Sequence, residues 1–261
     1  MKLVRLILVA EFALIFLACG GQMESFPVVN SESFNVKQIV IGGSLSPYLR
    51  SDSLGLIMDS SALTEKLEKM IRKTEALKKD SPDSVWNLLD KSWQEFQAKE
   101  IPSFADTSVN ALQVFQKWAG LNIRLLKLTS EARFGDALEK LMYDVQVPVL
   151  SESEFKSVIY TRIDDQIFIN IIGSSTLIHQ HTTGGAIKLI QETAFPSSDE
   201  MILKCECSDV RYLDVFIRIP EWSVNPTVSH GNVKYVARPG EYCQISRKWK
   251  DGDEFLIKLK N

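Results

Sequence analysis

The sequence predicts an α+β fold in which a short antiparallel helical bundle precedes a C-terminal β-sandwich. Two hydrophobic patterns support this prediction. Between about residues 60 and 147, apolar residues recur every three or four positions, as on one face of a helix. Farther along, short runs alternate between apolar and polar residues and are separated by Pro-Gly and Asp-Gly pairs, which is typical of antiparallel sheets. Of the 261 residues, 45% are hydrophobic, which is enough to form a core.

Residues 1–18 have the pattern of a bacterial signal peptide. Lys2 and Arg5 precede an apolar run that is too short to cross a bilayer, which needs about 20 residues. The run ends at residues 16–19, Phe-Leu-Ala-Cys, which are similar to a lipobox. We therefore expect Cys19 to be diacylated and to anchor the chain in the cell envelope, on the periplasmic or outer-membrane side. The alternative is an ordinary secretory peptide with an incidental cysteine.

Residues 19–58 are expected to form a polar tether that contains one possible strand. Alternation between apolar and polar residues over 34–41 predicts the strand, and Gly42-Gly43 ends it. This strand either joins the C-terminal sandwich or is a separate remnant, and the pattern leaves both possibilities open.

Residues 59–147 are expected to form four helices that pack as antiparallel hairpins. Ser61 can cap the first helix, and Ser81-Pro82-Asp83 begins the second with proline in its first turn. Ile101-Pro102 separates the second helix from the third, and Thr129-Ser130 separates the third from the fourth.

Residues 148–261 are expected to form the sandwich, which a linker of about a dozen residues after Tyr143 connects to the helices. His179-Gln180-His181 precedes a Thr-Thr-Gly-Gly stretch and is interpreted as a loop. The predicted strands cover residues 159–162, 167–172, 186–192, 201–207, 215–222, 243–249 and 255–259.

Two segments of the chain carry a family resemblance. Residues 218–259 contain RIPEW, HGN, RPGEY and RKWKDGDEFLIKL, and residues 122–144 read NIRLLKLTSEARFGDALEKLMYD. Both resemble glycoside hydrolase family 127, the β-L-arabinofuranosidase family, in the family's order. The resemblance implies a six-hairpin α/α barrel followed by a sandwich, of which the helices here would be a partial barrel. Matching positions are Asn122, Arg124, Leu125, Leu128, Thr129, Asp136, Glu139 and Tyr143, and departures are Ser130, Phe134, Asp144 and His230-Gly231-Asn232.

The resemblance also implies a catalytic site that this sequence does not reproduce. Enzymes of the family bind zinc through one Glu and three Cys, one of which attacks the sugar, and a nearby Glu acts as acid and base. The Glu-Thr-Cys element is Asp106-Thr107-Ser108 here, and there is no cysteine between Tyr143 and Tyr160 to form the adjacent cysteine pair. Glu95 lies upstream of Asp106, roughly where the acid/base residue would fall. Glu95 and Asp106 are therefore the remaining catalytic candidates, and we expect no metal and no cofactor.

The other cysteines, Cys205, Cys207 and Cys243, lie in predicted strands. Cys205 and Cys207 are two positions apart, so they lie on the same face of a strand. They are small core residues, or one pair forms a disulfide, or the three join a histidine in a tetrahedral metal site. The spacing matches no established zinc pattern, and the disulfide pairing stays open.

These features predict an exported lipoprotein that resembles a shortened, degenerate family 127 glycoside hydrolase and lacks the zinc and cysteine site. We expect a non-catalytic accessory that binds a glycan or a partner glycosidase, attached to the membrane through its N-terminal lipid. The alternative is an active glycosidase that acts on arabinose-containing glycans through a rebuilt pair of carboxylates. The net charge of -3 and pI of about 5.7 indicate no affinity for nucleic acid.

Overall fold

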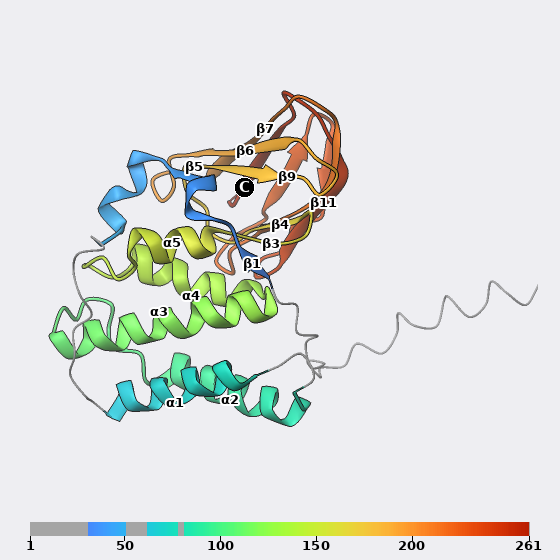
Figure 1. The fold of residues 1–261 in the computed structure, drawn as a ribbon. Coiled ribbons are helices and arrows are strands. Elements are labelled where there is room, and N and C mark those ends of the chain that lie inside the picture. Colours follow the sequence, from blue (N-terminus) through green and yellow to red (C-terminus); the bar gives the residue numbers. More distant parts are fainter. Residues whose placement is uncertain (1–30, 51–61, 78–80, 261) are drawn as a thin grey trace, which may run out of the picture.

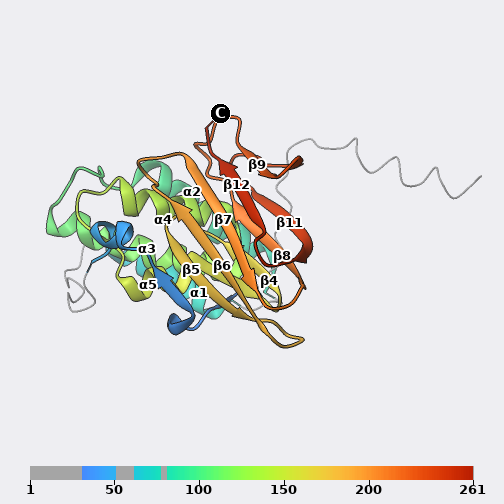
Figure 2. The ribbon, with the colours of Figure 1, turned by 90° about the horizontal axis from the view of Figure 1, so that it is seen from above.

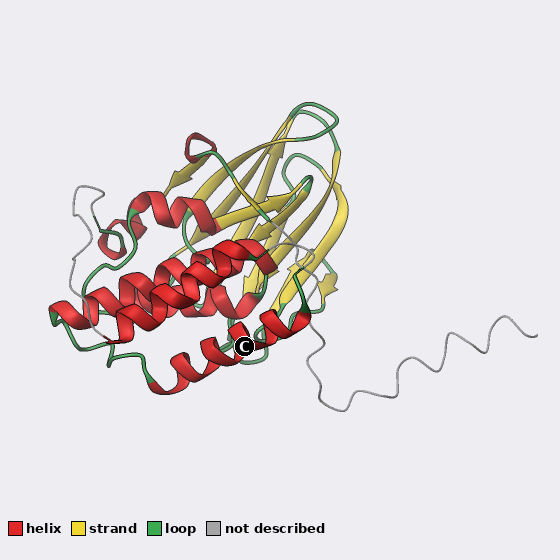
Figure 3. Cartoon of the chain, turned by 60° about the horizontal axis from the view of Figure 1, so that its bottom comes forward, coloured by secondary structure: helices red, strands yellow, loops and turns green. Residues whose placement is uncertain are grey.

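The computed structural model describes residues 31–50, 62–77 and 81–260 of the chain. Its helices gather on one side and its strands on the other, so the predicted α+β fold is confirmed (Figure 3). In Figure 1 the layers follow one another from α1 and α2, through α3 and α4, to α5 and then the sheets.

The four predicted helices are confirmed, with boundaries close to those expected. The third begins at Ser108, whose hydroxyl accepts a hydrogen bond from the Ala111 amide at 3.2 Å, and it ends at Ser130 in the left-handed conformation with φ of 53°. The helices are α1 (Ala62–Ala76), α2 (Asp83–Lys99), α3 (Val109–Thr129) and α4 (Ala132–Tyr143).

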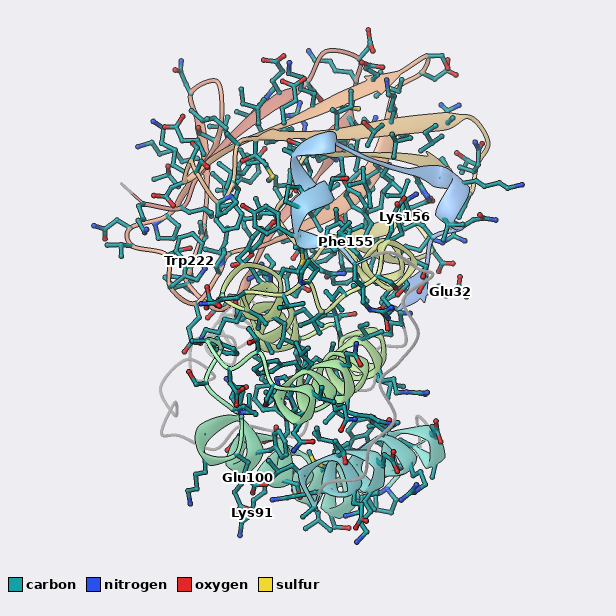
Figure 4. All side chains as sticks on the ribbon, turned by 90° about the vertical axis from the view of Figure 1, so that its left-hand side faces the viewer. Glu32, Lys91, Glu100, Phe155, Lys156 and Trp222 are labelled. Atoms are coloured by element: carbon teal, nitrogen blue, oxygen red, sulfur yellow. The ribbon has the colours of Figure 1, made fainter. Side chains whose placement is uncertain are left out.

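A fifth helix, α5 (Glu152–Ile159), occupies the stretch that was expected to be a linker, so that prediction is wrong. The Ser151 side chain accepts a hydrogen bond from the Glu154 amide, and the Glu154 side chain accepts one from the Ser151 amide, which is a capping box. This Ser-x-x-Glu signal is visible in the sequence. In Figure 4 Phe155 of this helix lies at the boundary between the helices and the sheets, and its side chain is fully buried.

The strands form two sheets, one ordered β1-β3-β4-β8-β11 and the other β10-β9-β12-β7-β6-β5-β2. All neighbouring strands are antiparallel except the pair β4 and β8. Figure 2 shows β5, β6, β7 and β12 of the larger sheet side by side. The strands of the smaller sheet are β1 (Glu32–Ser33), β3 (Tyr160–Ile163), β4 (Gln166–Ile169), β8 (Arg211–Arg218) and β11 (Tyr242–Trp249). Those of the larger sheet are β2 (Ile39–Ile41), β5 (Ser175–Gln180), β6 (Ala186–Thr193), β7 (Glu200–Cys207), β9 (Thr227–His230), β10 (Val233–Tyr235) and β12 (Glu254–Lys258).

The N-terminal segment contributes an edge strand to each sheet. β1 pairs with β3, and β2 pairs with β5, so the possible strand at residues 34–41 joins the sandwich. Only Ile39–Ile41 is extended, because residues 36–38 form a 3-10 turn that the Asn35 side chain caps. Of the two possibilities that the sequence left open, the first is correct.

A buried arginine joins the helices to the sandwich. Arg218 ends β8, and its fully buried guanidinium pairs with Asp136 and Glu139, which share one face of α4 at a spacing of three. Its Nε donates to the backbone carbonyl of Asn170. Burial would lower the pKa of Arg218, but the two carboxylates raise it, so the guanidinium stays charged.

The same carboxylates hold the chain that follows β8. Glu139 accepts a hydrogen bond from Trp222 Nε1 at 2.8 Å, and Asp136 accepts one from the Glu221 amide at 3.2 Å. A Cβ at position 135 would come within 2.7 Å of Arg218 Cδ, so glycine is required there. Matching positions from both segments of the family resemblance therefore meet at this junction, where their role is structural. Trp222 marks the place in Figure 4.

We predict that Arg218→Met lowers the free energy of unfolding by about 3–5 kcal/mol, because it leaves two buried carboxylates without a counter-charge. Urea denaturation of the purified protein measures this change. Adding Asp136→Asn and Glu139→Gln to the same variant should restore part of the loss, since no charge then remains buried.

Arg238→Met is the matched control, because Arg238 pairs with Glu241 at the surface, where the loss should stay below about 1 kcal/mol. If Arg218→Met unfolds at the same urea concentration as the control, the junction does not depend on this ion pair.

Candidate functional site

The residues at the position of the family's Glu-Thr-Cys element serve to begin α3. Asp106 Oδ1 accepts a hydrogen bond from the Ser108 amide at 2.8 Å, and the Ser108 hydroxyl caps the helix through the Ala111 amide. The hydrogen bond from the Ser108 amide lowers the pKa of Asp106 below its ordinary value. A general acid needs a raised pKa, so Asp106 is poorly suited to donate a proton.

The zinc site that the family resemblance implies does not fit these residues. Asp106 offers one carboxylate, but a serine hydroxyl is a poor zinc ligand beside the thiolate it would replace. Within the described part of the chain, no three His, Cys, Asp or Glu side chains come together in a way that could hold a metal ion.

Glu95, the other catalytic candidate, lies on the exposed face of α2. Leu89, Trp93 and Phe96 on the opposite face of this helix are buried. In the described structure no hydrogen bond or ion pair joins Glu95 to Asp106, and neither residue is among those that line the groove between α2, α3 and α4. The nearby Glu100 pairs with Lys66. No direct contact therefore links the two catalytic candidates.

The described cysteines are free thiols in the sandwich. Cys205 and Cys207 lie on one face of β7 with their sulfur atoms 4.0 Å apart, and Cys243 is buried in β11. Burial raises the pKa of Cys205, which neighbouring Cys207 raises further, and burial raises the pKa of Cys243 to about 11. Protonated thiols are poor nucleophiles and poor metal ligands. Of the possibilities left open by the sequence, these residues fit that of small core residues.

His179 lies in strand β5 and is fully buried, so its interpretation as part of a loop is wrong. Its Nε2 contacts Asp165 Oδ1 at 2.8 Å, and Asp165 also accepts hydrogen bonds from the amide and hydroxyl of Thr182. His181 Nε2 contacts the carbonyl of Tyr212 in β8 at 3.0 Å. This cluster fastens the β5–β6 hairpin to the smaller sheet and is not arranged as a metal site.

We predict that the protein loses stability as the pH falls from about 7 to 5. Burial lowers the pKa of His179, against an opposing effect of Asp165, while Arg162 and His181 lower it further. An unfolded histidine takes up its proton near pH 6.5, before the folded one does, so protons favour unfolding in this window. One such group changes the free energy of unfolding by at most about 1.4 kcal/mol per pH unit.

His179→Gln should flatten this dependence in urea denaturation series at several pH values. Asp165 acts in a separate window below about pH 4, because the hydrogen bonds that it accepts lower its pKa. An equal slope in wild type and His179→Gln would contradict the prediction.

A groove of about 610 Å³ lies among α2, α3, α4 and the loop that follows α2. Sequence reasoning missed it, because its aromatic residues have the spacing of ordinary core positions. It is lined by Trp93, Gln94, Gln97, Ala98, Ile101, Pro102, Ser103, Phe104, Trp118, Ala137, Lys140 and Leu141.

The predicted lipidation site, Cys19, and the predicted signal peptide lie outside the described residues. Among the helices that the structure does describe, none combines the length and apolar character needed to span a membrane.

The fold is similar to those of solved glycoside hydrolases. It aligns with a solved glycoside hydrolase at a TM-score of 0.64 and 14% identity, covering 76% of this chain and 46% of that one. A GH127 β-L-arabinofuranosidase from Geobacillus stearothermophilus T6 aligns at 0.62 and 15% identity, over 76% and 42%. Another GH127 β-arabinofuranosidase aligns at 0.61 and 17% identity, with the same coverage of 76% and 42%.

Residues 166–260 match the family model described as the middle domain of GH127 β-L-arabinofuranosidases. Together with the structural likeness, this match makes the chain GH127-like, as the sequence motifs predicted. The chain spans less than half the length of each of these solved structures. A comparison with curated protein sequences gives no match.

Proposed function

We propose that this GH127-like chain is a non-catalytic accessory of glycan breakdown, tethered to the bacterial envelope by a lipid on Cys19. Its role would be to bind a glycan or a partner glycosidase. The observation that carries the proposal is the start of α3, where Asp106 and Ser108 are engaged in capping the helix. These are the positions at which family resemblance places the first two zinc ligands.

The three thiols in the described part of the chain do not replace the missing nucleophile. Cys205, Cys207 and Cys243 lie in β7 and β11 of the sandwich, whereas Asp106 lies beside the helices. Burial raises the pKa of Cys205 and Cys243, so both stay protonated near neutral pH. A site that lacks its covalent nucleophile loses rate by orders of magnitude.

The alternative, an active glycosidase with two carboxylates, has less support. Such a mechanism needs two carboxyl groups about 5–10 Å apart on opposite sides of a sugar, one of them with a raised pKa. Glu95 is exposed, Glu100 is paired with Lys66, and hydrogen bonds keep Asp106 ionised.

The junction between the helices and the sandwich, in contrast, keeps all of its ion pairs. The junction of Arg218 with Asp136 and Glu139 is fully paired, and Trp222 and the Glu221 amide complete its hydrogen bonds. A chain that keeps a stable support without the reactive groups is suited to presenting a surface, and this favours a binding role.

We predict that the purified protein does not hydrolyse nitrophenyl β-L-arabinofuranoside or other pentosides and holds less than stoichiometric zinc. Product release and metal content are measured on the same sample. Turnover that disappears in Glu95→Gln or Asp106→Asn would restore the enzyme hypothesis. Retardation in gels that contain arabinan or xylan tests the glycan-binding role, and co-purification with a GH127 enzyme tests the partner role.

We predict that Cys19→Ser moves the protein from the membrane fraction to the soluble fraction, because a diacylated N-terminal cysteine is its proposed membrane anchor. Fractionation of bacterial cells followed by detection of the protein measures this shift, and Cys243→Ser serves as the control that should stay with the membrane. Equal fractionation of the Cys19→Ser variant and wild type would reject lipid anchoring.

A further inference from the structure

The groove among α2, α3 and α4 has a rigid apolar floor. Trp93 and Trp118 stack with their ring centroids 5.5 Å apart, and Phe96 stacks on Trp118 at 5.1 Å. The only polar atom of the Trp93 side chain, Nε1, donates to Asn122 at 2.9 Å, so the ring offers the groove carbon surface alone. Ile101, Phe104 and Leu141 extend this apolar lining. A volume of about 610 Å³ is within the range of small-molecule sites.

Two polar groups of the groove stand out against this lining. Gln97 Oε1 is buried and accepts no hydrogen bond in the described structure, which is costly for a carbonyl oxygen unless a bound molecule supplies a donor. The neighbouring Gln94 is already engaged, because its Nε2 donates to Asp90 at 2.8 Å.

Lys140 supplies the second group. It is exposed on α4, lines the groove, and forms no ion pair with any described residue. The carboxylates of the same helix, Asp136 and Glu139, are both engaged by Arg218. An ammonium group beside apolar carbon surface attracts an anion that carries an apolar body.

We propose that this groove binds an amphiphilic carboxylate: an apolar chain or ring system with one carboxylate for Lys140 and one hydroxyl or amide donor for Gln97. The apolar body covers the surface of Ile101, Phe104 and Leu141. This ligand class is separate from the glycan of the proposed function, and the inference stands without that function.

A sugar is a poor occupant of the same groove. Each of its hydroxyl groups needs a hydrogen-bond partner when buried, and the polar lining side chains amount to Gln94, Gln97, Ser103 and Lys140. Gln94 is committed to Asp90. An apolar ligand with two polar ends leaves fewer groups unsatisfied.

The experiment titrates the purified protein with ω-hydroxydodecanoate, dodecanoate, dodecanediol and L-arabinose, using calorimetry and tryptophan fluorescence. Trp93 and Trp118 form the floor, so binding should change the emission. We expect the hydroxy acid to bind most tightly. Dodecanoate should bind more weakly because it lacks the donor, dodecanediol more weakly because it lacks the charge, and arabinose should not bind.

Two variants test which residue binds each polar end of the ligand. Lys140→Gln should weaken both acids by about two- to fivefold, the ordinary range for an exposed ion pair, and should leave the diol unchanged. Gln97→Leu should weaken the hydroxy acid by about three- to tenfold, as for one hydrogen bond, without weakening dodecanoate. Lys91→Gln is the matched control, since Lys91 lies on α2 outside the groove lining (Figure 4).

Ala98→Trp tests the location independently. Ala98 is exposed and lines the groove, so a large side chain there should fill the groove and abolish binding while the melting temperature stays close to that of wild type. The proposal is overturned if no acid binds, if arabinose binds as tightly as the acids, if Ala98→Trp leaves the affinity for the acids unchanged, or if Lys140→Gln weakens neither acid.

Discussion

The ion pairs of Arg218 with Asp136 and Glu139 are the interaction on which the arrangement of this protein depends. A buried guanidinium is tolerated only where its charge and its donors are satisfied. Here the arginine comes from the end of β8 and the carboxylates from α4, so neither half of the molecule can bury its own charge alone. The same carboxylates hold Trp222 and the Glu221 amide, which fixes the path of the chain as it leaves the strand. The helical layer is thus positioned on the sandwich by ion pairs and hydrogen bonds as well as by apolar contact.

Most of the elements could be predicted because their hydrophobic periodicity is local. The helices α1 to α4 repeat apolar residues at helical spacing, and β6, β7 and β11 alternate. The helix α5 was missed because it has only eight residues and few apolar positions, although Ser151 and Glu154 form a capping box that indicates its start. Strand β5 was missed because His179 resembles a surface residue in the sequence, whereas Asp165 allows it to be buried.

The junction and the groove depend on contacts between residues distant in the chain, which periodicity does not report. Arg218 lies 82 positions from Asp136 and 79 from Glu139, and only the motif positions suggested that these residues matter. The candidates Glu95 and Asp106 came from the family resemblance, but burial and hydrogen bonding decide what a carboxylate can do. Asp106 and Ser108 are both engaged in hydrogen bonds at the start of α3.

β1 lies at an edge of the smaller sheet and β2 at an edge of the larger sheet. This placement has a mechanical consequence. Ser31, the first described residue, donates its amide to the carbonyl of Lys127 at 2.7 Å, and the chain continues directly into the two-residue strand β1. A force applied to the N-terminal side would therefore act first on β1, at the edge of the smaller sheet, and open its few hydrogen bonds one after another. β2 would carry the load next, while the central strands of both sheets keep their partners. These edge strands would absorb tension as a short extension of the chain and shield the core from it.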